Sequence, residues 1–265
     1  MNNHDISSDQ IGKTLDELQK VKWGVDFSRY KAVFSGTTME VYEFGKDVHF
    51  GGQLKPHKRR KRNRYLGIRK PFSISRARLK IRRLIACNSG QYDGFKDKFM
   101  TFTFAKNIKN LKEANALWSK FIPRLKKYVG HPLKYVAVVE FQDKNRGGVI
   151  HYHAVFFHLP YILNDKIAEI WSHGFIKINN VRKIHSIGAY VSKYLQKGVV
   201  DARLFNEKCY FTSRGLKKPI IVRVPPLDID LLAPNPVEYK LEETRQLPFC
   251  KWTGLTTYKR YAKIE

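Results

Sequence analysis

The stretch YVAVVEFQDKNRGGVIHYH, Tyr135–His153, decides the fold of the chain, because it predicts two β-strands joined by a short polar turn. Residues 135–142 are mostly β-branched and aromatic, as strand residues are. Residues 143–148 form a polar cluster that ends in two glycines, which is typical of a turn. Strand-like composition resumes over residues 149–159. The stretch therefore predicts an antiparallel hairpin.

Two histidines and one carboxylate are expected on one face of this hairpin. His151 and His153 are two residues apart in a strand, so their side chains point the same way. If the hairpin closes symmetrically about Asn145 and Arg146, Glu140 lies opposite His151 with Cβ atoms about 5 Å apart. Such a trio can hold a divalent metal ion and leave positions open for a substrate. The alternatives are two polar histidines on a half-exposed face, and a one-residue slip that turns Glu140 away.

The charge of the chain indicates a polyanionic partner. Fifty Lys and Arg residues against 23 Asp and Glu give a net charge of +27, so DNA or RNA is the first candidate. No apolar run approaches the roughly 18 residues of a membrane span, and no lipidation signal is present, so we expect no membrane partner. Cys87, Cys209 and Cys250 form no C-x-x-C motif, which is typical of reduced thiols in an intracellular protein.

A basic segment precedes the hairpin. Residues 55–83 contain 14 Lys or Arg and no acidic residue, and HKRRKRNR at residues 57–64 is the densest block. We predict that this arm contacts phosphates, although a solvated segment or a nuclear-localisation signal has the same composition. The predicted DNA contacts in the arm are Arg59, Arg60, Lys61, Arg62 and Arg64. Helical spacing over Ser75–Cys87 adds a basic amphipathic helix.

The order of predicted elements indicates an α+β fold. A strand at 99–105, a helix from 110 to 130 that Pro123 bends or splits, the hairpin, a helix at 164–173, a strand at 175–181 and a helix at 185–197 follow one another. This is the split βαβ order of a ferredoxin-like antiparallel sheet, with helices on one face and the other face open. At 265 residues the chain allows one full domain and a smaller appendage. The predicted parts are residues 1–54 with a small β-hairpin, 55–90 with the basic arm and helix, 91–219 as the main domain, and 220–265 as a tail that packs on or extends this domain.

Two tyrosines lie on the last predicted helix of the main domain. In GAYVSKYLQKG, Tyr190 and Tyr194 are four residues apart and share a helix face. In one interpretation they belong to an apolar stripe with Val191 and Leu195. In the other, the apolar residues pack on the sheet while the two hydroxyls face the histidines.

Three motifs in this order resemble those of HUH endonucleases: FMTFTF at 99–104, HYH at 151–153 and YVSKYLQK at 190–197. The chain looks like the rolling-circle replication initiators (Rep) of plasmids and small phages. The resemblance implies a DNA endonuclease and strand transferase that nicks and rejoins single-stranded origin DNA. Tyr190 or Tyr194 would be the nucleophile, Lys193 would favour its phenolate, and His151, His153 and Glu140 would hold Mn²⁺ or Mg²⁺. The products would be a 5′-phosphotyrosyl protein and a free 3′-OH, with Lys197 and Arg214 as further DNA contacts.

The resemblance also implies partners and a location. The expected partners are single-stranded DNA at an origin hairpin, a host helicase and a host polymerase, because the helicase domain of some relatives is missing here. The expected location is the cytoplasm of a bacterial host, or the nucleus if the replicon is eukaryotic. Two alternatives stay open: an HUH transposase or relaxase, and a non-catalytic ferredoxin-like protein that binds RNA or single-stranded DNA through sheet aromatics such as Phe102 and Phe104.

Overall fold

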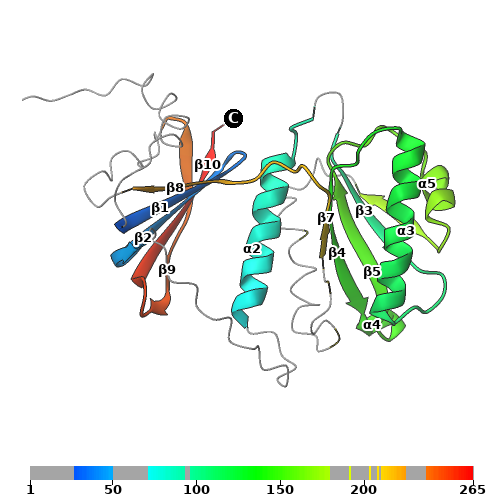
Figure 1. Ribbon diagram of the computed structural model, residues 1–265, viewed down its shortest axis with the longest axis horizontal. Helices are drawn as coiled ribbons and strands as arrows, with labels where there is room; N and C mark the ends of the chain where they lie inside the picture. Colours follow the sequence, from blue (N-terminus) through cyan, green and yellow to red (C-terminus); the bar gives the residue numbers. More distant parts are fainter. Residues whose placement is uncertain are drawn as a thin grey trace, which may run out of the picture. The chain divides into compact units, whose positions relative to one another are not determined.

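The computed structural model describes residues 27–49, 71–92, 96–179, 191, 203, 208, 210–224 and 237–264. The chain divides into two compact units. The terminal unit comprises Met1–Arg62 and Pro219–Glu265, and the central unit comprises Asn63–Lys218. Each contains a five-stranded antiparallel sheet (Figure 1), so the predicted α+β class is confirmed.

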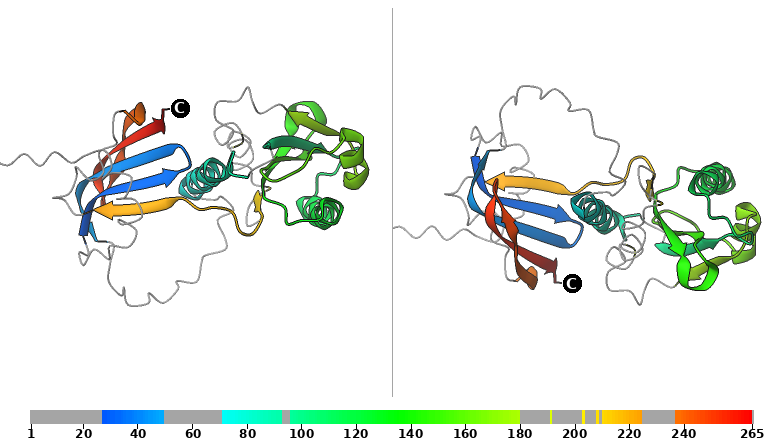
Figure 2. Two further views of the ribbon diagram at one scale, coloured as in Figure 1. Left: turned by 90° about the horizontal axis from the view of Figure 1, so that it is seen from above. Right: turned by 90° about the horizontal axis from the view of Figure 1, so that it is seen from below.

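The terminal unit joins strands from both ends of the chain in one sheet of order β8-β1-β2-β10-β9 (Figure 2). The predicted N-terminal hairpin is confirmed, with its turn at Gly36. The predicted strand at 220–224 is also present. The tail does not extend the sheet of the main domain as expected, because β8 pairs with β1 and β10 pairs with β2. The strands are β1 (Phe27–Ser35), β2 (Thr38–His49), β8 (Ile220–Val224), β9 (Tyr239–Cys250) and β10 (Gly254–Lys263).

A buried cluster ties these strands together. Tyr258 of β10 packs with Val33 of β1 and with Tyr42 and Phe44 of β2. Its hydroxyl donates a hydrogen bond to Oε1 of the buried Glu40 at 2.8 Å. The core of the terminal unit thus depends on residues more than 200 positions apart in the chain.

The central unit follows the predicted element order. Its sheet has the strand order β6-β3-β5-β4-β7. The elements are α2 (Pro71–Asn88), β3 (Lys98–Thr103), α3 (Leu111–Val129), β4 (Tyr135–Gln142), α4 (Asp143–Arg146), β5 (Val149–Phe156), α5 (Asn164–Trp171), β6 (Ile176–Asn179) and β7 (Tyr210–Thr212). The helix α2 begins four residues before the predicted Ser75, at a proline, which is favoured in the first helical turn.

The helix α3 is stopped at both ends as its sequence predicts. The Asn110 side chain accepts hydrogen bonds from the backbone N–H groups of Lys112 and Glu113, and Gly130 ends the helix in the left-handed conformation. Pro123 does not split the helix. Pro123 and Ser119, four residues earlier, are both exposed, so solvent can satisfy the carbonyl that a proline leaves without a donor. None of the described helices has the length and apolar character needed to cross a membrane.

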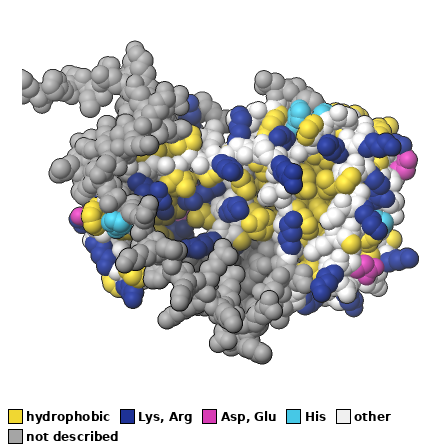
Figure 3. Space-filling view, viewed as in Figure 1, with side chains coloured by type: hydrophobic (Ala, Val, Ile, Leu, Met, Phe, Trp, Pro, Cys, Tyr) yellow, Lys and Arg dark blue, Asp and Glu magenta, His cyan; other side chains and the backbone are white. Residues whose placement is uncertain are grey.

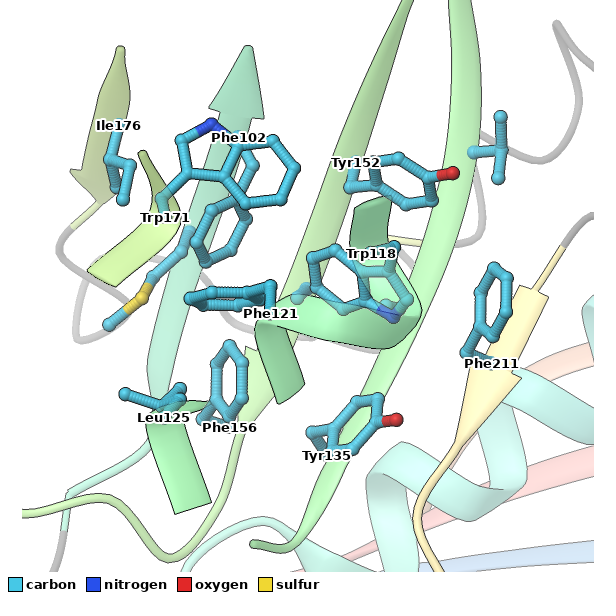
Figure 4. Close-up of a cluster of buried hydrophobic side chains, with 14 of the residues drawn as sticks. Phe102, Trp118, Phe121, Leu125, Tyr135, Tyr152, Phe156, Trp171, Ile176 and Phe211 are labelled. Atoms are coloured by element: carbon cyan, nitrogen blue, oxygen red, sulfur yellow. The ribbon is translucent and has the colours of Figure 1, made fainter. Parts of the chain in front are cut away.

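Aromatic side chains form the core between the sheet and the helices α3 and α5 (Figure 4). The Trp118 ring of α3 stacks on Tyr152 of β5 with centroids 4.7 Å apart. Phe102 of β3 lies edge-on to both Trp118 and Trp171 of α5, at 5.3 Å from each. Because this core fixes β3 and β5 side by side, it also fixes the opposite face of the same strands.

The opposite face is not open, contrary to the prediction that helices cover only one face. Ile81 and Ile85 of α2 are buried in a second cluster with Phe99, Val136 and Val155 of the sheet. The apolar residues of this part of the face need cover, and α2 supplies it with the amphipathic stripe that the sequence shows. The remainder of this face carries Glu140, His151 and His153.

Candidate active site

The predicted register of the central hairpin is confirmed. Glu140 of β4 pairs directly with His151 of β5, as a closure about Asn145 and Arg146 requires. The polar turn is a single helical turn, α4, followed by Gly147 and Gly148 with positive φ angles of 55° and 88°. On the other side of β5, the strand β3 places Thr101 opposite His153 and Thr103 opposite His151. The carboxylate and the two imidazoles therefore share one face of adjacent strands.

His153 is held by polar groups on both sides of its ring. Nε2 lies 2.7 Å from Oε2 of Glu140, and Nδ1 lies 3.0 Å from the Thr101 hydroxyl. The ring also stacks on Phe99, with centroids 6.0 Å apart and planes 16° apart. An ionised carboxylate can only accept, so Nε2 donates to Glu140, and Nδ1 of the neutral ring accepts from Thr101. The hydroxyl of Thr101 can also accept, so it can serve either tautomer of His153.

His151 is buried but has a nitrogen without a partner. The residue is 4% exposed, and its Nε2 has no hydrogen-bond partner within the described part of the chain. Burial lowers the pKa of His151 to about 4, and the neighbouring His153 and Arg146 act in the same direction, while Glu140 opposes them. His151 is therefore neutral at pH 7, with its lone pair available to a ligand.

Two arginines at the hairpin turn were missed by sequence reasoning as parts of the site. Arg146 donates from Nη1 to the Phe104 carbonyl at 2.9 Å and from Nη2 to Oδ1 of Asn107 at 2.8 Å. Arg203 pairs with Asp143 at 2.9 Å. Together they fix the turn and bring positive charge to the end of the strands that carry His151. The only sequence signal was the position of Arg146 in the turn before HYH, and Arg203 had none.

The trio is not a ready-made coordination sphere. No group of three or more His, Cys, Asp or Glu side chains among the described residues is arranged to hold an ion as it stands. Glu140 and His153 are bonded to each other, and His151 contributes the unpartnered Nε2. The donor set of two imidazoles and one carboxylate suits Mn²⁺ and, less well, Mg²⁺. The residues therefore fit a divalent metal chemically, provided that the contact between Glu140 and His153 opens.

The tyrosine helix is described at one position only. Val191 has helical backbone geometry, is fully buried and belongs to the cluster with Phe99, Val138 and Val155. It therefore packs on the face of the sheet that bears the histidines, as one interpretation of the sequence predicted. The predicted nucleophiles, their lysine and most predicted DNA contacts lie outside the described residues: Tyr190, Tyr194, Lys193, Lys197, Arg59, Arg60, Lys61, Arg62 and Arg64.

Arg214 is the one predicted DNA contact that the structure describes. It is exposed and forms no ion pair with a described acidic residue, while its carbonyl accepts a hydrogen bond from Lys134. Figure 3 shows Lys and Arg side chains spread over the described surface of one face, with few Asp or Glu side chains among them. This surface charge agrees with the polyanionic partner that the composition predicts.

One comparison with known proteins gave a match. Residues 97–199, less than half of the chain, match the family model of the replication-associated protein ORF2. The matched segment runs from β3 past HYH to both tyrosines. Neither the curated proteins nor the solved structures gave a significant match. The central unit is thus similar to replication-associated proteins of the ORF2 family, and this similarity supports a replication initiator.

Proposed function

We propose that the chain initiates rolling-circle replication by nicking and rejoining single-stranded origin DNA as an HUH endonuclease. The phenolic oxygen of Tyr190 or Tyr194 would attack the phosphorus of one phosphodiester. A P–O bond to the tyrosine forms while the P–O3′ bond breaks, and the 3′ oxygen takes up a proton as it leaves. The products are a 5′-phosphotyrosyl protein and a free 3′-OH that primes synthesis, and attack by a 3′-OH on the phosphotyrosine reseals the strand.

The observation that carries this proposal is the register of β4 against β5. It brings Glu140 directly opposite His151 on the face where His153 also lies. A phosphodiester is a poor electrophile because it is negatively charged, so a nuclease must place positive charge at the phosphate oxygens. Two neutral imidazoles beside a carboxylate suit a metal ion, whereas a binding surface for nucleic acid has no need of this buried cluster.

His151, His153 and Glu140 would hold Mn²⁺ or Mg²⁺. A bound ion would act as a Lewis acid that stabilises the charge developing on the phosphate. Of the protein groups, Thr101 fixes the orientation of the His153 ring, and Arg146 fixes the turn next to His151. Lys193 would favour the phenolate of the attacking tyrosine, because a nearby positive charge lowers the pKa of a phenol.

The fold and the position of Val191 support the same proposal. The order β6-β3-β5-β4, with strands joined as β-α-β-β-α-β, is that of a ferredoxin-like sheet, the scaffold that we propose for this HUH domain. Val191 is buried on the histidine face and is the sequence neighbour of Tyr190. We propose single-stranded origin DNA, a host helicase and a host polymerase as partners, in the host cytoplasm or, for a eukaryotic replicon, the nucleus. A transposase or relaxase would use the same chemistry on a different DNA end.

The alternative of a non-catalytic binder loses its proposed stacking platform. Phe102 is fully buried and Phe104 is 1% exposed, both in the core under α3 and α5. A base cannot stack on either ring without opening that core.

The decisive experiment is a covalent-adduct assay. The full chain is incubated with 5′- or 3′-labelled single-stranded DNA from candidate origins and Mn²⁺, and the products are separated on a denaturing gel. We expect a labelled protein band that EDTA abolishes and that is lost in the Tyr190→Phe Tyr194→Phe double variant, with the single variants identifying the first nucleophile. His151→Ala should abolish the band without loss of folding. An adduct that persists in the double variant, or that forms equally in EDTA, would sink the proposal.

A further inference from the structure

A lysine and an exposed aromatic ring lie on the histidine face at the edge strand of the central sheet. Ile176 of β6 points into the aromatic core beside Phe102 and Trp171 (Figure 4). Side chains alternate along a strand, so Phe175 and Lys177 point to the opposite face. Lys177 is in register with Thr101, which is in register with His153. The row Lys177, Thr101, His153 therefore crosses three neighbouring strands on one face.

The backbone of Phe175 is fixed although its ring is uncovered. Its carbonyl accepts hydrogen bonds from the Thr103 N–H at 2.9 Å and from the Thr103 hydroxyl at 2.8 Å, which extends the ladder between β3 and β6 by one residue. The side chain is nevertheless 64% exposed. A ring held on a rigid backbone but left in solvent is pre-organised to receive a flat ligand, because little conformational freedom remains to be lost on binding.

The position of this pair relative to the histidines sets the kind of ligand. Neighbouring strands are about 4.8 Å apart, so β6 lies about 10 Å from β5 across the sheet. That separation is within reach of a short run of nucleotides whose phosphate lies at His151. An aromatic ring next to a lysine is the combination that binds single-stranded nucleic acid, since bases stack on the ring and phosphates pair with the cation.

We propose that Phe175 and Lys177 form a nucleotide subsite for single-stranded DNA beside the active site. A base stacks on the exposed face of Phe175, and Lys177 contacts the adjoining phosphate. The strand thus passes over β6 and β3 before its scissile phosphate reaches the histidines. The subsite rests on the proposed function in that it assigns the path of the same substrate, but binding at the subsite needs neither metal nor nucleophile.

The first test measures binding without chemistry. Fluorescence anisotropy of a labelled oligodeoxythymidylate is recorded with the full chain in EDTA. We expect Phe175→Ala to weaken binding by about 5-fold or more, which is the effect of removing one base–aromatic stack, and Phe175→Trp to retain it. Tyr161→Ala is the matched control, because Tyr161 is an aromatic residue that is 82% exposed in the loop before α5. Thermal melts by circular dichroism establish that each variant folds.

The second test uses salt. Removing one cation that pairs with a phosphate of a single strand should reduce the slope of log K against log salt concentration by about 0.7. We expect this reduction for Lys177→Gln and none for Lys126→Gln, which removes an exposed lysine of α3 on the other side of the sheet. Photocrosslinking with 5-iododeoxyuridine, followed by peptide mapping, should identify Phe175.

The outcomes separate this proposal from the nuclease. Equal affinities for Phe175→Ala and Tyr161→Ala, with no crosslink at Phe175, would overturn the subsite even if wild-type chain forms the covalent adduct. Weaker binding by Phe175→Ala in a chain that forms no adduct would support the subsite and leave the nicking proposal refuted.

Discussion

The two histidines of HYH have different surroundings although both are buried on one sheet face. His153 has partners at both ring nitrogens, whereas Nε2 of His151 has none within the described residues. This difference assigns distinct tasks to them, since one ring is oriented by the protein and the other offers a free lone pair.

At the residue scale, the low pKa of His151 makes stability depend on pH. The pKa is about 4 in the folded chain against about 6.5 when unfolded, so below pH 6.5 the unfolded state binds a proton that the folded state does not. Stability from this group is complete above about pH 6.5 and is lost as the pH falls toward 4, by up to about 3 kcal/mol. Urea unfolding in EDTA at pH 7 and pH 4.5, compared between wild type and His151→Gln, isolates the effect. An identical pH dependence in the two proteins would contradict it.

The hydroxyl of Thr101 should tune metal affinity through His153. Thr101→Val removes the hydrogen bond to Nδ1, so we expect Mn²⁺ affinity, measured by calorimetry, to fall by about 10-fold, with Thr101→Ser near wild type. Thr103→Val is the control, because the Thr103 hydroxyl donates to the Phe175 carbonyl rather than to a histidine. Equal losses in the two valine variants would mean that the effect is structural.

At the scale of elements, Gly174 lets the chain approach the end of β3 closely enough for β6 to pair with it. It has φ of 149°, and a Cβ there would clash with the backbone at Ala105 and lie 2.6 Å from the Thr103 carbonyl oxygen. Gly174→Ala should therefore destabilise the central unit by at least about 2 kcal/mol in urea unfolding. Gly90→Ala is the matched control, because Gly90 has φ of 65° but open space around it, and we expect about 1 kcal/mol. Similar losses for both would show that crowding is unimportant.

Local patterns predicted the elements and the hairpin register but not what covers them. The pairing of Glu140 with His151 follows from the two-residue centre of the turn, and α3 follows from its 3.6-residue period and its caps. The packing of α2 on the histidine face was missed, since a basic segment leading into a helix looked like one arm. The position of Phe175 on that face was missed too, because alternation is informative only once Ile176 is known to be buried.

At the scale of the whole molecule, the pairing of the two chain ends had no sequence signal. The strand β9 carries charged residues and Pro248, a composition that is tolerated because β9 is the edge of its sheet. Neither strand of the C-terminal hairpin was predicted. Periodicity cannot report a partner more than 200 residues away, so only coordinates could show that β10 pairs with β2.

Deleting residues 237–265 should therefore unfold the terminal unit and spare the central one. The deletion removes the partner of β2 over residues 38–44 and takes Tyr258 out of the buried cluster. In hydrogen-exchange mass spectrometry we expect amides of β1 and β2 to lose protection, while those of β3, β4 and β5 keep theirs. The intact chain is the reference, and loss of protection in both sheets would contradict the independence of the units.

The pairing of β10 with β2 also imposes an order on synthesis. The central unit leaves the ribosome complete, flanked by one half of a sheet whose other half has not been made. Its β-hairpin at residues 27–49 keeps unsatisfied edges until residues near 263 emerge, so the central unit can begin to fold first and the terminal unit must form later.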